Sequence, residues 1–181
     1  LASRSRRPTT CRRTPLRLSS ATSDLRYRRK SFMRTATSVA GRFQLWRVNV
    51  STGASVVVEE GSRTTASWIV DRTGRPVLRQ DVISGGRGFA WFRRGPGQTE
   101  WVEVVRFIGA SGANSGPTFQ GVGPALEPGQ VFVLARRESE DTSGLHVFDT
   151  STGEYIETVH TNPDFDISNA ILNRKTNTIL A

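Results

Sequence analysis

Several short groups of residues have the types that catalysis or nucleotide binding uses, but each lacks part of the pattern that its chemistry needs. A serine nucleophile on a strand-to-helix elbow needs Gly-x-Ser-x-Gly. The nearest string, Gly109–Ala113 (GASGA), lacks the final glycine. Gly121–Gly123 (GVG) is similar to the start of a dinucleotide-binding loop, but Leu126 stands where the third glycine is required and no helical pattern follows. We therefore predict a strand at Gly121–Gly123.

Candidate metal and anion ligands are equally incomplete. Asp164–Ser168 alternates oxygen-bearing side chains, yet it lacks the glycine and the distal glutamate of a calcium loop. His146 and His160 fall within or beside predicted strands, with no second His or Cys at ligand spacing. Backbone amides of Gly85–Gly88 could bind a phosphate, although a loop joining two strands explains these residues equally well. Asn49–Ser51 matches a glycosylation sequon. We predict no catalytic, cofactor-binding or metal-binding residues and no cofactor.

The positive charge of the chain is confined to its N-terminal end. The formal net charge is +9, but residues 1–44 hold 12 Lys and Arg against one acid, whereas residues 45–181 hold 13 against 15. Like charges at this density oppose compaction, so we expect residues 1–44 to be a disordered or mis-framed leader. An organelle transit peptide and a phosphate-contacting arm are the alternatives. Because no nucleic-acid-binding module accompanies the charge, we predict no nucleic-acid partner.

The sequence says little about cellular location. Cys11 is the single cysteine, which excludes an intrachain disulfide and a cysteine-rich zinc site. No run of about 18 apolar residues occurs, so we predict no membrane-spanning helix and no membrane partner. The first residues lack the apolar segment of a secretory signal peptide. Localisation is therefore unknown from the sequence.

From Gln44 onward the pattern is one of short strands separated by Gly, Pro and Asn turns, without helical periodicity. Such a pattern predicts an all-β fold. The strands are expected at Leu45–Val50, Ala54–Glu60, Ala66–Asp71, Pro76–Val82, Gly88–Arg93, Thr99–Val105, Thr118–Leu126, Gln130–Arg136, Gly144–Asp149, Glu154–His160, Ser168–Asn173 and Thr178–Ala181.

Two kinds of turn alternate along these strands. One contains Ser-Thr-Gly and recurs at Gly53 and Gly153, 100 residues apart. The other follows an apolar strand and ends at Gly74, Gly129 and Asn177, which are 55 and 48 residues apart. All five residues tolerate positive φ. Two interleaved series with a common period near 50 residues predict repeats of two hairpins, the four-stranded blades of a β-propeller. A β-sandwich would not predict this interleaving.

Counting by this period gives two full four-stranded blades, at 66–105 and about 118–160. Half blades flank them, with two outer strands at 45–60 and the opening strands of a fourth blade at 168–181. A closed propeller typically has four to eight blades. We therefore expect residues 45–181 to form an incomplete β-propeller that stops partway round its ring.

Four strings together carry a resemblance to a known family. They are Leu45–Gly53 (LWRVNVSTG), Ser67–Val77 (SWIVDRTGRPV), Gly144–Gly153 (GLHVFDTSTG) and His160–Asp166 (HTNPDFD). They resemble the N-terminal β-propeller domain of the prolyl-oligopeptidase-like serine peptidases, the group that includes dipeptidyl aminopeptidases and acylaminoacyl peptidases. The resemblance covers residues 45–181. It implies a propeller that restricts peptide access to a C-terminal α/β-hydrolase domain, in which the catalytic Ser, Asp and His of that family lie.

Two functional hypotheses follow from the resemblance. In the first, the chain is the non-catalytic, gating propeller segment of a serine peptidase. It would be inactive alone, and its partners would be the missing hydrolase domain, the remaining blades and the peptide substrates of the parent enzyme. In the alternative, the chain is a stand-alone propeller scaffold that binds a partner protein through its blade loops.

Overall fold

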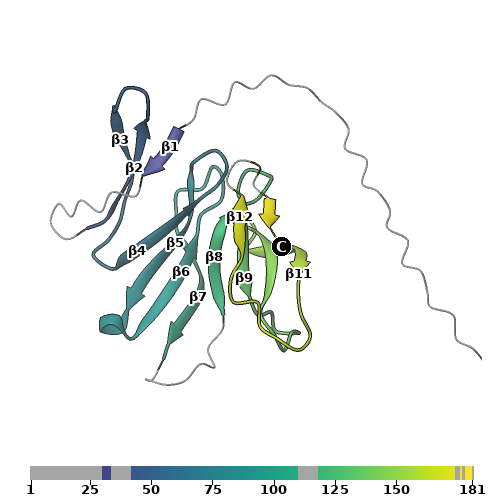
Figure 1. Ribbon diagram of the computed structural model, residues 1–181. Helices are drawn as coiled ribbons and strands as arrows, with labels where there is room; N and C mark the ends of the chain where they lie inside the picture. The colour runs from purple at the N-terminus through teal and green to yellow at the C-terminus, as the bar shows by residue number, and fades with distance from the viewer. Residues whose placement is uncertain (1–29, 34–41, 110–117, 174–175, 177, 181) are drawn as a thin grey trace, which may run out of the picture.

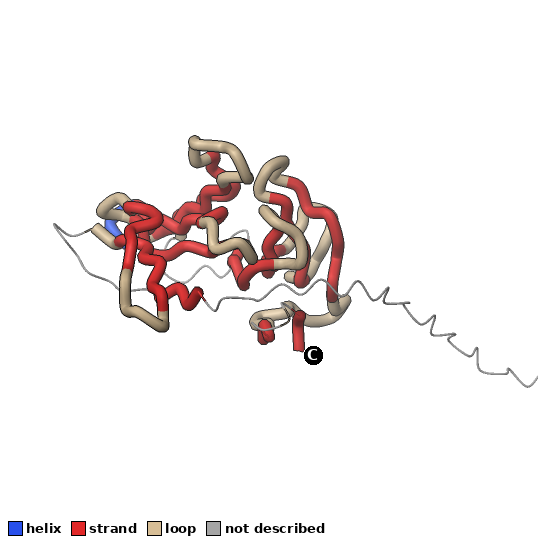
Figure 2. The backbone as a smooth tube through the Cα atoms, turned by 90° about the horizontal axis from the view of Figure 1, so that it is seen from above, coloured by secondary structure: helices blue, strands red, loops and turns tan. Residues whose placement is uncertain are grey.

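A computed structural model describes residues 30–33, 42–109, 118–173, 176 and 178–180 of the chain. Within these residues the regular structure is β-strand apart from one short helical turn, η1 (Ser84–Gly86), as Figure 2 shows. The all-β prediction is confirmed. The strands are β1 (Lys30–Met33), β2 (Gln44–Asn49), β3 (Ser55–Glu60), β4 (Thr65–Val70), β5 (Pro76–Ile83), β6 (Gly88–Arg93), β7 (Val102–Ile108), β8 (Phe119–Pro124), β9 (Gln130–Ala135), β10 (Gly144–Asp149), β11 (Glu154–His160), β12 (Ile171–Asn173) and β13 (Thr178–Leu180).

The strands form four antiparallel sheets in chain order (Figure 1). Two of them are four-stranded meanders, β4-β5-β6-β7 and β8-β9-β10-β11, and they coincide with the two predicted four-stranded units. The chain ends in the two-stranded sheet β12-β13, which was also predicted. Within each sheet every strand pairs with its neighbour in sequence.

The first sheet differs from the prediction. It has three strands, β1-β2-β3, where we predicted two. The additional strand lies inside residues 1–44, which were expected to remain outside the fold, and it pairs from Lys30↔Asn49 to Met33↔Trp46. That expectation is wrong for these four residues. Strand pairing uses backbone groups, so the free edge of β2 accepts a segment whose sequence shows no apolar period. Residues 1–29 and 34–41 lie outside the described residues.

Strand boundaries follow tertiary contacts where they depart from the prediction. β7 begins at Val102 instead of Thr99, because Gln98 is engaged in the preceding loop. The side-chain oxygen of Gln98 accepts a hydrogen bond from the Gly95 amide at 2.9 Å, and its side-chain nitrogen donates one to the Ser151 carbonyl at 3.3 Å. The predicted turn glycines are confirmed, with φ of 72° at Gly53, 82° at Gly74, 79° at Gly129 and 84° at Gly153. Asn177 lies outside the described residues.

The sheet β8–β11 is covered on both faces. On one face its buried side chains Phe119, Val131, Val133 and Phe148 pack against Val77, Leu78 and Trp91 of the sheet β4–β7. On the other face, Phe132, Leu134, Leu145 and Val147 pack against Leu172 and Ile179 of the terminal hairpin and against Ile167 and Ala170 before it. A strand with both faces buried is apolar throughout, which explains the uninterrupted sequence VFVLA of β9.

Glycines bring the first strands of successive sheets together. A Cβ atom on Gly121 would lie 2.6 Å from Ile69 Cγ1 on β4, and one on Gly123 would lie 2.5 Å from Leu172 Cδ2 on β12. A β-bulge between Gly121 and Gly123 breaks the pleat alternation, so the two glycines open toward opposite faces of β8. The strand β8 is therefore held closely between β4 and β12. Each contact needs a residue without a side chain.

Candidate functional site

The turn that follows β4 is closed by the side chain of Asp71, whose carboxylate accepts four hydrogen bonds. Asp71 is 3% exposed, and its Oδ1 accepts bonds from Thr73 N at 2.8 Å, Thr73 Oγ1 at 2.6 Å and Arg75 N at 3.0 Å. Its Oδ2 accepts from Gly129 N at 3.3 Å, which belongs to the turn before β9. One carboxylate thus closes its own turn and also ties the two four-stranded sheets together.

A second set of bonds continues this link to the turn after β10. Thr150 Oγ1 donates to the Gly129 carbonyl at 2.6 Å, and the backbone nitrogen of Thr150 donates to the same oxygen at 3.0 Å. From the other sheet, Arg93 donates to the carbonyls of Thr150 at 2.9 Å and Ser151 at 2.7 Å. We call the set Asp71, Arg93, Gly129, Thr150 and Ser151 the turn belt. Its polar groups satisfy one another, so the belt holds sheets together and leaves little free for a ligand.

Charged and aromatic side chains join the three-stranded sheet to β4–β7. The Arg94 guanidinium pairs with the Glu59 carboxylate through two bonds of 3.2 and 2.7 Å, and Trp101 Nε1 donates to Glu59 at 3.3 Å. The guanidinium carbons of Arg94 and Arg79 lie 4.2 and 5.1 Å from the Trp101 ring centroid. This stacked ion pair is partly buried, and its planar groups are matched to each other. The ion pair therefore links the three-stranded sheet to the sheet β4–β7.

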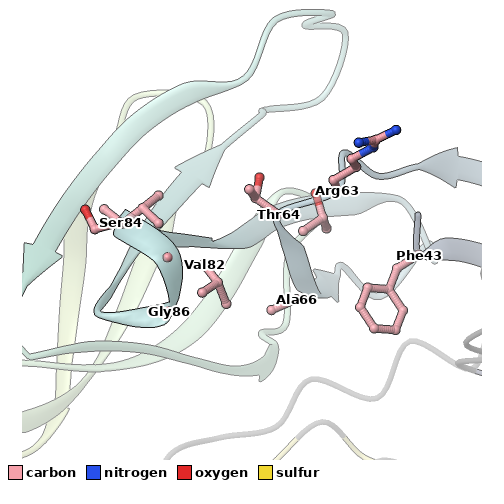
Figure 3. Close-up of a pocket in the computed structure, with 10 residues that line it drawn as sticks. Phe43, Arg63, Thr64, Ala66, Val82, Ser84 and Gly86 are labelled. Atoms are coloured by element: carbon pink, nitrogen blue, oxygen red, sulfur yellow. The ribbon is translucent and has the colours of Figure 1, made fainter. Parts of the chain in front are cut away.

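A cavity of about 300 Å³ lies at the end of the sheets opposite the turn belt. It is bounded by Phe43 before β2, by the start of β4 and by the end of β5 with η1. Phe43, Ala66 and Val82 point to the same side, whereas the Arg63 guanidinium extends the other way (Figure 3). The Gly85–Gly88 segment predicted as a loop or phosphate cradle lies here, with positive φ at Gly85 and Gly86. The cavity walls are mostly apolar, which favours a small apolar group over an anion.

The other residues singled out from sequence serve local structure where they are described. Gly121–Gly123 is part of β8, as predicted. Asp166 Oδ1 accepts from Ser143 N at 2.6 Å and so anchors the loop before β12. Asn49 Oδ1 accepts from Ser51 N at 3.0 Å within its turn. The string Gly109–Ala113 lies outside the described residues beyond Gly109 itself.

His146 is fully buried and its ring is held from several sides. Nε2 lies 3.2 Å from the Ala135 carbonyl and 3.3 Å from Glu140 Oε2, and Nδ1 lies 3.2 Å from Thr158 Oγ1. The ring of Tyr155 meets it edge-on at 5.4 Å between centroids. Burial raises the pKa of the Tyr155 phenol, an effect that nearby Arg137 opposes and Glu140 adds to. Because it is buried and its ring nitrogens have polar neighbours, we interpret His146 as a structural core residue. The other histidine, His160, is exposed at the end of β11.

Neither a metal-ligand cluster nor a similarity to a known protein points to a function. No group of three or more His, Cys, Asp or Glu side chains that could hold a metal occurs among the described residues. In the same part of the chain no helix is long and apolar enough to cross a bilayer. No protein-family model matches the sequence, and no curated protein and no solved structure match it.

Sequence analysis did not identify the groups that link the sheets. The bond from Gly129 to Asp71 joins residues 58 positions apart, and the pair Glu59–Arg94 joins residues 35 apart. A signal for Asp71 was present: an Asp two residues before Thr73 and four before Arg75 can cap its own turn. Nothing in the spacing indicates that its second oxygen reaches another sheet.

Proposed function

We propose that this chain is a segment of a β-propeller that covers the catalytic domain of a serine peptidase and restricts peptide access to it. The observation that carries the proposal is the approach of β4, β8 and β12 through Gly121 and Gly123. In a propeller, the first strands of successive four-stranded sheets converge on a central axis, and a fan of sheets with glycine at that convergence is the corresponding arrangement.

The packing of the sheets supports the same proposal. The sheet β8–β11 has a neighbouring sheet on each face, as a blade inside a ring has, and the backbones of β4 and β8 run close together. The last strand of each sheet leads to the first strand of the next, from β3 to β4 and from β7 to β8. A β-sandwich would instead pair two sheets and leave each one face in solvent.

The peptidase part of the proposal rests on the four strings that resemble the prolyl-oligopeptidase-like enzymes. Two of them include turns of the sheets, Asp71–Gly74 and Asp149–Gly153, each closed by hydrogen bonds to the side chain of its own Asp. A gating propeller needs rigid blades and no catalytic group of its own. The described residues contain two linked four-stranded sheets, and the polar groups of their turn belt are engaged in structure.

An activity assay tests the catalytic part of the proposal. The purified chain is expected to leave peptidyl chromogenic substrates uncleaved. Turnover that survives further purification and is abolished by a serine-directed inhibitor would refute a non-catalytic role. Sequencing the transcript past the codon for Ala181 separates the two hypotheses. Gly-x-Ser-x-Gly followed by Asp and His supports the peptidase, and further blades without them support a binding scaffold.

A further inference from the structure

The cavity beside Phe43 presents apolar surface to solvent within the described part of the chain. Val82 of its wall is 39% exposed, whereas Val77 at the other end of the same strand is fully buried. On the side of η1, a Cβ atom built on Gly85 or Gly86 would meet no heavy atom within 4 Å. The volume of about 300 Å³ is at the lower end of the range for small-ligand pockets, about 300–1,000 Å³. It therefore suits a single side chain better than a whole ligand.

Hydrogen bonds hold the walls of this cavity in place. The backbone nitrogen of Val82 donates to the Thr64 carbonyl at 2.8 Å, which joins the end of β5 to the start of β4. Thr65 is 1% exposed and donates through Oγ1 to Asp81 Oδ1 at 2.9 Å. The same carboxylate oxygen lies 3.1 Å from Arg79 Nε, so the charge of Asp81 is already compensated. Because the walls are fixed in advance, binding a ligand there costs little ordering of the protein.

The charge at the cavity is positive. None of its lining residues is acidic, and the single charged one is Arg63. Arg42 precedes the lining residue Phe43, and Arg87 follows the lining residue Gly86. All three arginines are exposed, and none forms an ion pair within the described residues. Apolar walls beside unpaired positive charges are complementary to an apolar group flanked by carboxylates.

The place of the cavity in the fold connects it to the path of a peptide, an inference that rests on the proposed function. β4 is the strand that meets β8 at Gly121, so in the proposed propeller it is an inner strand. The cavity lies at the first residues of β4, near the axis along which a peptide would pass. We propose that the cavity binds one apolar side chain of a peptide whose adjacent residues are acidic, and that the parent enzyme admits peptides of this class.

The direction of Arg63 agrees with such a ligand. Its guanidinium lies on the side away from Phe43, Ala66 and Val82, as Figure 3 shows. Successive side chains of an extended peptide point to opposite sides. When one apolar side chain enters the cavity, the acidic residue next to it therefore points toward the side of Arg63. The apolar wall and the arginine thus read two neighbouring positions of one peptide.

Fluorescence anisotropy of a labelled peptide with the full chain tests this proposal. The probe is fluorescein-Gly-Glu-Glu-Leu-Glu-Glu-amide, which should bind more tightly than the same peptide with Ser in place of Leu. Val82→Glu should weaken binding of the Leu peptide by about tenfold or more, because the apolar contact with the Leu side chain is lost. The matched control is Val102→Glu, which adds the same charge and should leave binding unchanged. Val102 is 44% exposed and pairs with Arg93 of the turn belt, at the opposite end of the same sheet.

A second pair of variants tests the charge. Arg63→Ala should weaken binding by about two- to fivefold, and by less at high salt, where exposed charges are screened. Arg75→Ala, at an exposed position in the turn after β4, should have no effect. Circular dichroism of all four variants should match that of the unsubstituted chain, because each position is exposed.

The basic residues 1–44 require their own control, because they attract any acidic peptide. Binding to them would be equal for the Leu and Ser peptides and equal for the two Val→Glu variants. That result, or no binding at all, would overturn the cavity proposal. Neither result bears on the catalytic domain, which the sequence past the codon for Ala181 decides, so the peptidase proposal would stand or fall separately.

Discussion

The cross-sheet role of Asp71 leads to a prediction that separates turn closure from sheet linkage. In Asp71→Ala the chain loses four hydrogen bonds from a carboxylate that is 3% exposed. Three of the lost bonds come from Thr73 and Arg75, which are exposed and can turn to water. The fourth comes from the amide of Gly129, which is buried and has no backbone acceptor within the described part of the chain.

The expected destabilisation follows from these two kinds of bond. Each bond within the turn contributes about 0.5–1 kcal/mol net, and a buried amide left without a partner costs about 1–3 kcal/mol. The free energy of unfolding should therefore fall by about 3–5 kcal/mol. Asp149→Ala is the matched control. Its Oδ1 accepts from Ser151 N at 2.6 Å and Thr152 N at 3.3 Å within its own turn. Both bonds lie within the turn and neither reaches another sheet, so the loss should be about 1–2 kcal/mol.

Urea denaturation followed by tryptophan fluorescence measures both variants, since Trp91 lies in the core between the two sheets. The slopes of the transitions should match that of the unsubstituted chain, so that midpoints report stability. If Asp71→Ala costs no more than Asp149→Ala, the bond to Gly129 does not stabilise the junction, and the assignment of Asp71 to the turn belt is wrong.

Two further predictions concern the core. Gly121→Val places a side chain where a Cβ atom would lie 2.6 Å from Ile69 Cγ1, so overpacking should lower stability by about 1–3 kcal/mol in thermal unfolding, whereas Gln120→Val at an exposed position of β8 should not. Tyr155 has a pKa raised by burial, so the folded chain holds the phenol proton more tightly than the unfolded chain. Its contribution is fully present below about pH 10 and is lost as pH rises through the folded-state pKa. Tyr155→Phe should flatten that alkaline decline in denaturation midpoints, and an unchanged decline would contradict the assignment.

Local pattern was sufficient for the elements whose boundaries are set by turn chemistry. β6, β10 and β11 occur at the predicted residues, and Gly53, Gly74, Gly129 and Gly153 take positive φ as predicted. These boundaries depend on residues within four positions of each other. The grouping into four-stranded sheets also followed from local spacing, since a meander pairs only consecutive strands.

The sequence did not predict features that depend on contacts between residues far apart in the chain. The start of β12 moved to Ile171 because Ile167 N donates to the Ser143 carbonyl at 2.9 Å and holds the chain in a loop. The pairing of β1 depends on a free edge of β2, and the cavity beside Phe43 depends on three segments that meet only after folding. Its lining includes Gly85 and Gly86, which sequence analysis had singled out for a different ligand class.

The contrast between Gly121 and the aromatic residues on neighbouring strands sets the angle between the sheets. On β8 the contact with β4 contains no side chain at Gly121, whereas farther from it Trp91, Phe148 and Tyr155 fill the space between the same two sheets. Two sheets that touch along one margin and are held apart by aromatic side chains along the other margin form a wedge. The opening of that wedge depends on the difference in side-chain volume between the margins, because packed interiors do not compress. Enlarging residue 121 would therefore narrow the taper between the two sheets, and in the proposed propeller a narrower taper requires more sheets to close the ring.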